Sequence, residues 1–258
     1  MDTSKIAAQL YSVRDYTRDI DGFTETLKKI KKIGYSAIQL SGIGPIPHTD
    51  VVNTLKDSGL ICCATHENGD DLLKNPHVIA EKLTSLNCAF TAFPFRAFGP
   101  ENTVESIAAF AKELEQSGAI LAQSGITLTY HNHAHEFRQI AGMTILDRIY
   151  AGSNSAFLAA ELDTYWVQAG GGNPVDWCNK LSGRLPLLHL KDYGINEKDL
   201  PTFKEIGYGN LNWTAILAAA KNAGTKWFIV EQDTHWTNND PFESLKMSFE
   251  FLKSIAID

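Results

Sequence analysis

Short apolar runs alternate with amphipathic stretches along the whole chain, and this alternation limits the possible folds more than any other feature of the sequence. The apolar runs have the length of strands, and the stretches between them carry apolar residues at helical spacing or the start and stop signals of helices. Residues 21–33, for example, have apolar residues three or four positions apart, and Gly34 follows as a predicted C-terminal cap. The predicted strands are 5–13, 35–40, 60–65, 88–93, 126–131, 157–163, 185–191 and 227–230, where the ranges 157–163 and 185–191 include the polar residues that end the strand. The predicted helices are 21–33, 50–58, 76–86, 103–124, 143–150, one that begins at Pro174, 213–223 and 241–255.

Eight strand–helix pairs within 258 residues predict an α/β fold, a single closed (β/α)8 barrel known as a TIM barrel. An open doubly wound sheet is the alternative, and it fits this number of pairs less well. No break in composition and no low-complexity linker divides the chain, so we expect one domain over residues 1–258. Residues 192–212 are predicted to form a long loop.

The composition excludes several classes of protein. With 44% hydrophobic and 21% charged residues, the chain has material for a substantial soluble core. The net charge of −7 argues against a nucleic-acid surface. The start of the chain lacks a signal-peptide pattern, and no apolar run reaches the roughly 18 residues of a membrane span. We therefore expect a cytoplasmic protein that binds neither nucleic acid nor membranes.

The cysteines indicate neither a disulfide framework nor a zinc–thiolate site. The four cysteines form no CxxC pair, and their number is low for a disulfide-dense chain. Buried free thiols are expected at Cys62, Cys63, Cys88 and Cys178.

The strand predicted at 126–131 runs directly into a cluster of histidines. Side chains alternate across a strand, so Thr127, Thr129, His131 and His133 share one face. A face of a buried strand that ends in imidazoles is unusual, and it favours a functional site.

Three later strands end in the same polar manner. Asp163, His189 and Glu231 stand at the C-terminal ends of apolar runs, and in a parallel barrel the loops at these ends converge over one mouth. Together with His131 they provide two carboxylates and two imidazoles, a ligand set suited to Mn, Co, Zn, Fe or Mg. The pattern predicts one divalent metal ion, and a buried salt-bridge network is the alternative.

Motifs throughout the chain resemble those of the xylose isomerase-like TIM barrels, in particular the sugar phosphate isomerase/epimerase group. The motifs that carry the resemblance are QLYSVRD at 9–15, YHNHAHEF at 130–137, ELDTYW at 161–166, GR at 183–184, LHLKD at 188–192, GYG at 207–209 before Trp213, and VEQD at 230–233.

The resemblance implies a divalent metal held by Asp163, His189 and Glu231, which match the family's ligand positions on the last three strands. The fourth ligand in the ketose epimerases of this superfamily is a glutamate at the end of the fifth strand, where this chain has histidines. We expect His131 to replace that glutamate and His133 to act in substrate binding or proton transfer. Glu136 could also reach back to the metal.

The expected chemistry is removal of a proton from the carbon beside a carbonyl, because a cation stabilises the enediolate that forms. The candidate bases are His133, Glu161 and Glu231. We expect a metal-dependent isomerase or epimerase of a keto sugar or sugar derivative. The same enolate also serves a lyase of the inosose dehydratase or 3-keto-glycoside eliminase kind, which is the main alternative.

Two other functions are less well supported by the sequence. A DNA repair nuclease of the endonuclease IV type shares this barrel, but the acidic net charge and too few ligands for a three-metal cluster argue against it. A non-catalytic binding protein would require the carboxylates at the strand ends to be structural.

Several further residues are expected to contact a small carbohydrate substrate. Lys191 shares the inward face of His189, and it either donates to a substrate oxygen or pairs with Asp192 or Asp163. The other candidates stand at or just beyond strand ends: Gln9, Tyr11, His66, Glu67 and Trp166. For His66 and Glu67 the alternative is an exposed loop pair, and for Trp166 it is the core. A homodimer or homotetramer is expected.

Overall fold

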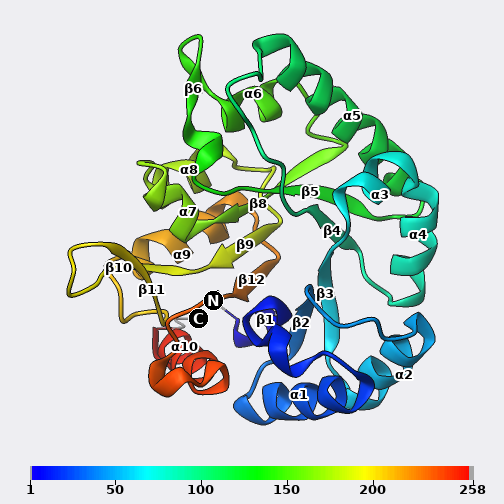
Figure 1. The fold of residues 1–258 in the computed structure, drawn as a ribbon, viewed down its shortest axis with the longest axis vertical. Helices are drawn as coiled ribbons and strands as arrows, with labels where there is room; N and C mark the ends of the chain where they lie inside the picture. The colour runs from blue at the N-terminus through cyan, green and yellow to red at the C-terminus, as the bar shows by residue number, and fades with distance from the viewer. Residues whose placement is uncertain (1, 256–258) are drawn as a thin grey trace.

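Eight parallel strands close into a barrel in this computed structural model, which describes residues 2–255 (Figure 1). The strands in barrel order are β1 (Ile6–Gln9), β2 (Ala37–Leu40), β3 (Ile61–His66), β4 (Phe90–Phe93), β5 (Thr127–His131), β8 (Leu158–Asp163), β9 (Leu187–Leu190) and β12 (Trp227–Val230). β12 pairs with β1 in parallel, which closes the ring. The predicted (β/α)8 fold is confirmed.

Helices surround the barrel on the outside. They are α1 (Ile20–Ile33), α2 (His48–Ser58), α3 (Gly69–Lys74), α4 (Pro76–Ser85), α5 (Val104–Ala122), α6 (Ile145–Ala151), α7 (Thr164–Ala169), α8 (Pro174–Lys180), α9 (Trp213–Ala223) and α10 (Pro241–Ile255). Residues at the helix ends determine where the helices begin and end. Asp19 caps the start of α1 by accepting from the Gly22 N–H at 2.8 Å, and Gly34 ends the helix because it adopts a positive φ of 125°. No helix of residues 2–255 is long and apolar enough to cross a membrane.

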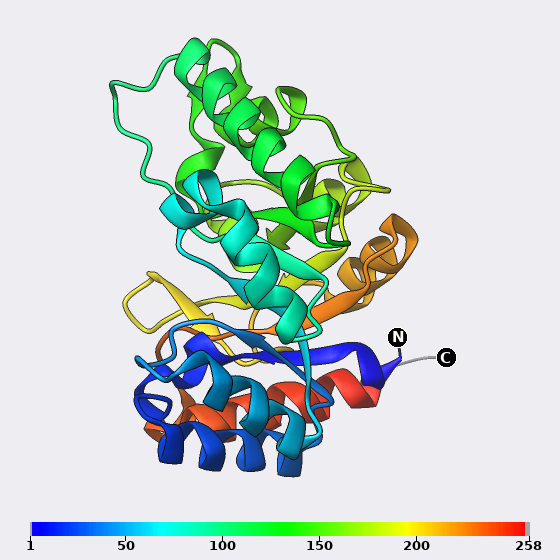
Figure 2. The same ribbon diagram turned by 90° about the vertical axis from the view of Figure 1, so that its right-hand side faces the viewer.

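The first and last helices pack together where the barrel closes. Figure 2 shows α1 and α10 side by side. The rings of Tyr35 and Phe249 lie 4.8 Å apart, and the Tyr35 hydroxyl donates to the Leu245 carbonyl at 2.8 Å. Since these residues are about 200 positions apart in sequence, their contacts tie the two ends of the chain into one core.

The inside of the barrel changes from apolar to polar toward the mouth. A small apolar cluster that includes Ala7, Ala37, Leu187 and Ile229 fills the interior. Side chains two positions apart share one face of a strand, so the residues that follow each of these by two point the same way. These are Gln9, Gln39, His189 and Glu231, all buried. The four cysteines are buried and free, as predicted.

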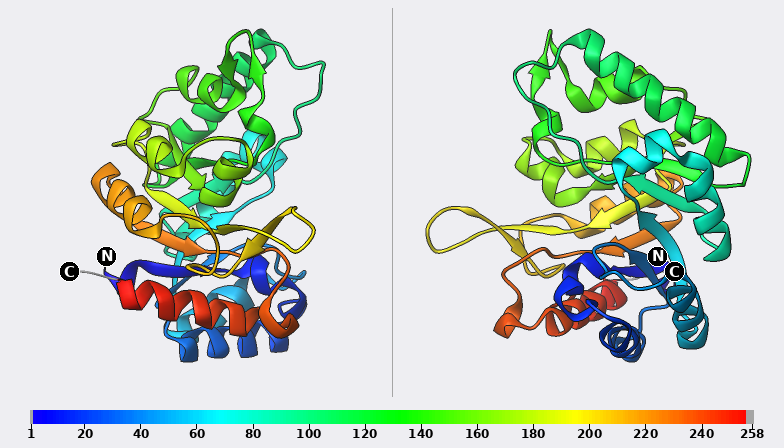
Figure 3. Two further views of the ribbon diagram at one scale, coloured as in Figure 1. Left: turned by 90° about the vertical axis from the view of Figure 1, so that its left-hand side faces the viewer. Right: turned by 45° about the vertical axis from the view of Figure 1, so that its right-hand side comes forward.

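Two strand and loop predictions were wrong in detail. The predicted strand 5–13 ends at Gln9, because its side chain accepts from the Tyr11 N–H at 3.3 Å and the chain turns into a 3-10 helix, Leu10–Tyr16. The predicted loop 192–212 contains a hairpin of β10 (Asp192–Ile195) and β11 (Pro201–Lys204), which projects from the barrel in Figure 3.

The chain between β5 and α6, and the chain after β3, also differ from the predictions. Two short paired strands, β6 (Gln139–Ile140) and β7 (Met143–Thr144), precede α6, so the helix predicted from 143 begins at Ile145. The short helix α3 was not predicted. Asn68 caps it by accepting from the Asp70 and Asp71 N–H groups.

A buried carboxylate holds the segment after the hairpin against the barrel. Asp192 accepts from the backbone N–H groups of Gly207 and Gly209 at 2.8 and 3.1 Å, and from the Trp213 indole N–H at 2.7 Å. Charge-assisted bonds of this kind are stronger than neutral ones, so Asp192 fixes where the chain re-enters α9.

Candidate active site

The polar ends of β5, β8, β9 and β12 meet at the mouth of the barrel. His131, Asp163, His189 and Glu231 are all buried, and each offers one ligand atom within 4.8 Å of the others. The strand alternation places His189 and Glu231 inward, because both follow apolar interior residues by two positions. The predicted set of four ligands is therefore brought together.

The geometry of these four residues fits a divalent cation. Nδ1 of His189 lies 2.9 Å from Glu231 Oε2 and 3.9 Å from Asp163 Oδ2. Asp163 uses Oδ1 to cap α7 at the Trp166 N–H, 3.0 Å away. Its buried Oδ2 makes no hydrogen bond and faces the Lys191 ammonium at 3.2 Å. His131 Nδ1 likewise makes no hydrogen bond and faces Glu161 Oε1 at 3.3 Å. A cation among the four residues would be a partner for both atoms, whose hydrogen-bonding capacity is not met by these contacts.

The electrostatics of the cluster reflect packed carboxylates and imidazoles. Burial would lower the pKa of His189, but Glu161 and Glu231 outweigh it and raise the value to about 10. Burial raises the pKa of Asp163 to about 6, although Lys191 opposes this shift. Burial and the neighbouring His189 lower the pKa of His131 to about 3. A neutral imidazole is the form that binds metal, so His131 is in its ligand form at neutral pH.

Lys191 is a buried cation among carboxylates. Its ammonium lies 3.2 Å from Asp163 Oδ2, 2.9 Å from Glu231 Oε2 and 3.1 Å from Asp233 Oδ2. The predicted ion pair with Asp163 is present, whereas Asp192 binds the chain before α9 instead. Burial alone would lower the pKa of Lys191, but the three carboxylates raise it well above its usual value. Lys191 is therefore a permanent hydrogen-bond donor.

Glu161 lies deeper in the barrel than Asp163 and is fully buried. Its Oε1 lies 2.5 Å from His66 Nε2, 3.1 Å from His189 Nε2 and 3.3 Å from His131 Nδ1. Its Oε2 accepts from the Gln39 amide at 2.8 Å. Glu161 thus contacts these histidines and does not line the cavity described below. With His66, His131 and His189 it forms a second group whose possible ligand atoms lie within 4.8 Å of one another.

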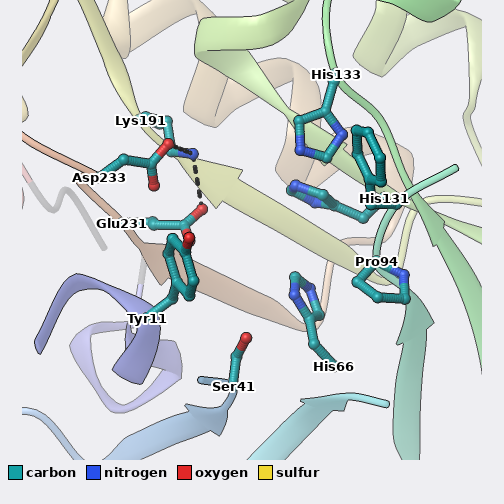
Figure 4. A pocket seen from close by; sticks show the side chains of 10 residues that line it. Tyr11, Ser41, His66, Pro94, His131, His133, Lys191, Glu231 and Asp233 are labelled. Atoms are coloured by element: carbon teal, nitrogen blue, oxygen red, sulfur yellow. Dashed lines mark hydrogen bonds and ion pairs between the residues drawn. The ribbon is translucent and has the colours of Figure 1, made fainter. Parts of the chain in front are cut away.

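A cavity of about 290 Å³ opens above this layer of histidines (Figure 4). It is lined by Tyr11, Ser41, His66, Pro94, Phe95, His131, His133, Lys191, Glu231 and Asp233. We call it the mouth cavity. Figure 4 shows Glu231, Lys191 and Asp233 on one side of it and His131 and His133 on the other.

His133 and Glu136 differ in their environments. His133 lines the mouth cavity, and its buried Nδ1 has no hydrogen-bond partner. Burial and the nearby His131 and Lys191 lower the pKa of His133 to about 2. Glu136 accepts from the Tyr130 hydroxyl at 2.9 Å and from the His133 backbone N–H at 2.8 Å. Its carboxylate is occupied by these bonds, which favours His131 over Glu136 as the fourth ligand.

Three predicted substrate residues lie outside the lining of the mouth cavity. Gln9 is fully buried and donates to Gln39 Oε1 at 2.9 Å, so it supports the site from below. Glu67 turns to the other side of β3 and pairs with Lys82 at 2.7 Å. The Trp166 ring lies 5.5 Å from the His133 ring, and its indole nitrogen is buried without a partner.

Several residues of the site were not predicted from the sequence. Asp233 was given no role, although it stands two positions after Glu231 and the strand alternation that predicts Glu231 also predicts Asp233. Gln39 also follows the inward alternation of β2, and its carbonyl accepts from His189 Nε2 at 2.6 Å. Ser41, Pro94 and Phe95 come from loops, where no periodic signal reports the direction of a side chain.

Comparisons with known proteins agree with this fold. A family model described as "Xylose isomerase-like TIM barrel" matches residues 27–255. No curated protein matches the chain.

Solved structures resemble the chain over nearly its whole length. Two sugar phosphate isomerase/epimerase structures from Parabacteroides distasonis each superpose with a TM-score of 0.82, at 19% and 22% identity. The first covers 99% of this chain and 95% of its own, and the second covers 96% and 97%. The IOLI protein with a bound zinc atom has a TM-score of 0.74 at 14% identity, covering 97% of this chain and 98% of its own. At such identities the similarity establishes the fold alone.

Proposed function

The chain belongs to the xylose isomerase-like TIM barrel family, and from this premise we propose that it is a divalent-metal-dependent isomerase or epimerase of a keto sugar or sugar derivative. The observation that carries this proposal is the cluster of His131, Asp163, His189 and Glu231, whose ligand atoms lie within 4.8 Å of one another at the barrel mouth. Structural neighbours described as sugar phosphate isomerase/epimerases, and one described with a bound zinc atom, support it.

These four residues would hold the cation. When bound, it supplies a Lewis acid that stabilises negative charge as a proton leaves the carbon beside a carbonyl. Mn, Co, Zn, Mg and Fe are all compatible with two imidazoles and two carboxylates.

Glu231 is our candidate for the group that accepts the proton. It lines the mouth cavity, whereas Asp163 does not. Burial would raise the pKa of Glu231, but Lys191 and His189 outweigh it and hold the pKa well below its usual value. The carboxylate is therefore ionised at neutral pH and able to accept a proton. Lys191, 2.9 Å away, keeps its charge and can donate a hydrogen bond to a substrate oxygen.

His133 is our candidate for proton transfer on the other side of the substrate. Figure 4 places it across the mouth cavity from Glu231. The low pKa of His133, about 2, keeps its imidazole neutral in the empty cavity, so one ring nitrogen accepts a hydrogen bond and the other donates one. Proton transfer by His133 requires in addition that the bound substrate raise this pKa toward neutrality. Epimerisation requires that a proton leave one face of a carbon and return to the opposite face, which two groups on different sides of a cavity can do.

Glu161 is better suited to positioning than to proton transfer. It is fully buried behind His189 and His131 and does not line the mouth cavity. A carboxylate behind a ligating histidine fixes the orientation of the ring and increases its basicity.

The test is hydrogen exchange in deuterium oxide. Protein reconstituted with manganese or cobalt is incubated with a panel of ketoses and aldoses, and proton NMR follows the carbon beside the carbonyl. Exchange and a new sugar are expected with the wild type and not with Glu231→Gln, whereas the exposed Glu250→Gln should behave as the wild type. Absence of exchange across the whole panel would refute the proposal.

The same experiment separates an isomerase from a lyase. Exchange followed by an isomeric sugar supports isomerisation or epimerisation. Exchange followed by loss of water or of a leaving group, seen as an unsaturated product, would replace the isomerase proposal with the elimination chemistry of the same enolate.

A further inference from the structure

A second pocket lies beside the mouth cavity, and we call it the side pocket. It has a volume of about 330 Å³ and lies between the loop that follows β2, the end of β3, and α2 and α4. Ser41 and His66 line both the side pocket and the mouth cavity. The two spaces are therefore neighbours that share one wall, and Figure 4 shows these two residues at the edge of the mouth cavity.

The two volumes indicate a substrate with two parts. Pockets for small molecules usually measure roughly 300–1,000 Å³. The mouth cavity, about 290 Å³, lies just below that range, and the side pocket, about 330 Å³, lies at its lower end. Only the combined volume of the two spaces lies near the middle of the range for small-molecule pockets. A ligand that fills both would therefore place one ring in the mouth cavity and a second ring in the side pocket.

The walls of the side pocket suit a second ring. Ile43, Ile46, Val51 and Leu86 provide apolar surface. Polar groups come from the ion pair of Glu67 and Lys82. A sugar ring has apolar C–H faces and a rim of hydroxyl groups, so it can pack on the aliphatic side chains while its hydroxyls meet the charged pair.

The charges argue against a phosphate in either space. Among the described residues that line the side pocket, Lys82 is the one lysine or arginine, and Glu67 neutralises it at 2.7 Å. Among the described residues that line the mouth cavity, the one lysine or arginine is Lys191, and three carboxylates surround its ammonium. Phosphate sites normally offer uncompensated cations, and these residues leave none.

We propose, building on the proposed function, that the mouth cavity and the side pocket form one binding site of two compartments for an uncharged glycoside. The keto sugar lies in the mouth cavity beside Glu231 and His133. The second ring lies in the side pocket against Ile46 and the Glu67–Lys82 pair. The substrate class is then a keto sugar that carries a second sugar or a similar ring, rather than a sugar phosphate.

The test measures binding by calorimetry with metal-reconstituted protein, so its readout does not depend on turnover. The probes are D-fructose, the keto-disaccharides turanose, maltulose, lactulose and isomaltulose, and fructose 6-phosphate. At least one disaccharide is expected to bind roughly tenfold more tightly than fructose. Fructose 6-phosphate is expected to bind no more tightly than fructose.

Two variants locate the second ring. Ile46→Trp fills the side pocket from a half-buried position, and it should remove the advantage of the disaccharide while leaving fructose binding unchanged. Val78→Trp places the same side chain at an exposed site on α4 and should change neither affinity. Lys82→Met is a second probe that removes the polar contact at a partly exposed residue, and it should weaken disaccharide binding alone.

Three results would overturn the inference. The first is equal affinity for fructose and every disaccharide, and the second is preferred binding of fructose 6-phosphate. The third is that Ile46→Trp, in protein with a wild-type melting temperature, weakens the binding of fructose and of the disaccharides equally. Each can occur while hydrogen exchange on a single-ring ketose persists. In that case the proposed function stands and the two-compartment site falls.

Discussion

The Nε2 nitrogen of His189 lies 3.1 Å from Oε1 of Glu161, on the side of the ring away from the carboxylates of Glu231 and Asp163. The amide of Gln39 accepts from the same nitrogen at 2.6 Å, and Gln9 in turn donates to that amide. Both neighbours of Nε2 are acceptors, so Nε2 carries a proton. The pKa of about 10 means that Nδ1 also carries a proton at neutral pH when no metal is bound, and it lies 2.9 Å from Glu231 Oε2. A cation at the proposed position would displace the Nδ1 proton, while Glu161 and Gln39 keep the Nε2 proton in place.

Glu161→Gln should therefore weaken metal binding without removing a ligand. The loss of the carboxylate behind His189 is expected to reduce metal affinity by roughly 10- to 100-fold, measured by competition with a chelator. Glu205→Gln is the matched control, because it also neutralises a buried carboxylate but lies outside the cluster. Unchanged metal affinity in Glu161→Gln would show that Glu161 does not position His189.

Metal content should distinguish ligands from other residues of the mouth cavity. Elemental mass spectrometry is expected to find about one divalent ion per chain in the wild type. Glu231→Gln and His131→Ala should lose it, because each removes one of four buried donors. His133→Ala should keep it. A wild type that stays metal-free after reconstitution with manganese would contradict the enolate chemistry and return these residues to a buried polar network.

His133→Ala should separate proton removal from inversion. Glu231 remains in this variant, so exchange of the substrate proton with deuterium oxide is expected to continue. Formation of the inverted sugar should fall by about 100-fold or more, since the second acid–base group is missing. Both rates come from one NMR time course. His77→Ala, at an exposed position, should leave them unchanged, and a parallel loss of both rates in His133→Ala would argue for a single-base mechanism.

Glu205 should make stability depend on pH in a defined direction. Its Oε1 accepts from the hydroxyls of Ser244 at 2.6 Å and Thr237 at 3.0 Å. Burial would raise the pKa of Glu205, but these hydrogen bonds outweigh it and lower the value below the usual 4.5. A carboxyl with a lowered folded-state pKa stabilises the fold fully above its unfolded value, and the contribution disappears as the pH falls through the folded value.

Urea denaturation of Glu205→Gln and wild type tests this dependence. The variant should be less stable at neutral pH, and the difference in unfolding free energy should shrink as the pH falls below 4.5. Glu250→Gln, at an exposed position, should show no such trend. A constant difference at all pH values would mean that the carboxylate is not preferentially bound in its ionised form.

The proposed ligands could be predicted because strand alternation is a local property. His131 and Asp163 each end a strand, and His189 and Glu231 follow inward apolar residues by two positions, so their direction follows from the chain itself. The eight strand–helix repeats likewise predicted the barrel, and a barrel brings its strand ends to one mouth.

Depth in the barrel could not be predicted in the same way. Glu161 and Asp163 share one face of β8, yet one lies behind the histidines and the other beside His189. The difference depends on how β8 is staggered against β5 and β9, where Glu161 pairs with His131 and Leu187. Stagger is set by closure of the whole ring, which no single segment encodes.

By itself, the sequence determined the barrel, the inward direction of the polar strand endings and the kind of ligands that they offer, because periodicity and residue chemistry are carried by each segment alone. The tertiary structure decided that Lys191 lies among three carboxylates, that Glu67 pairs with Lys82 outside the mouth cavity, and that Ser41 and His66 line two neighbouring pockets. These relationships join side chains from different strands and loops, and their distances exist only once the chain has closed into the barrel.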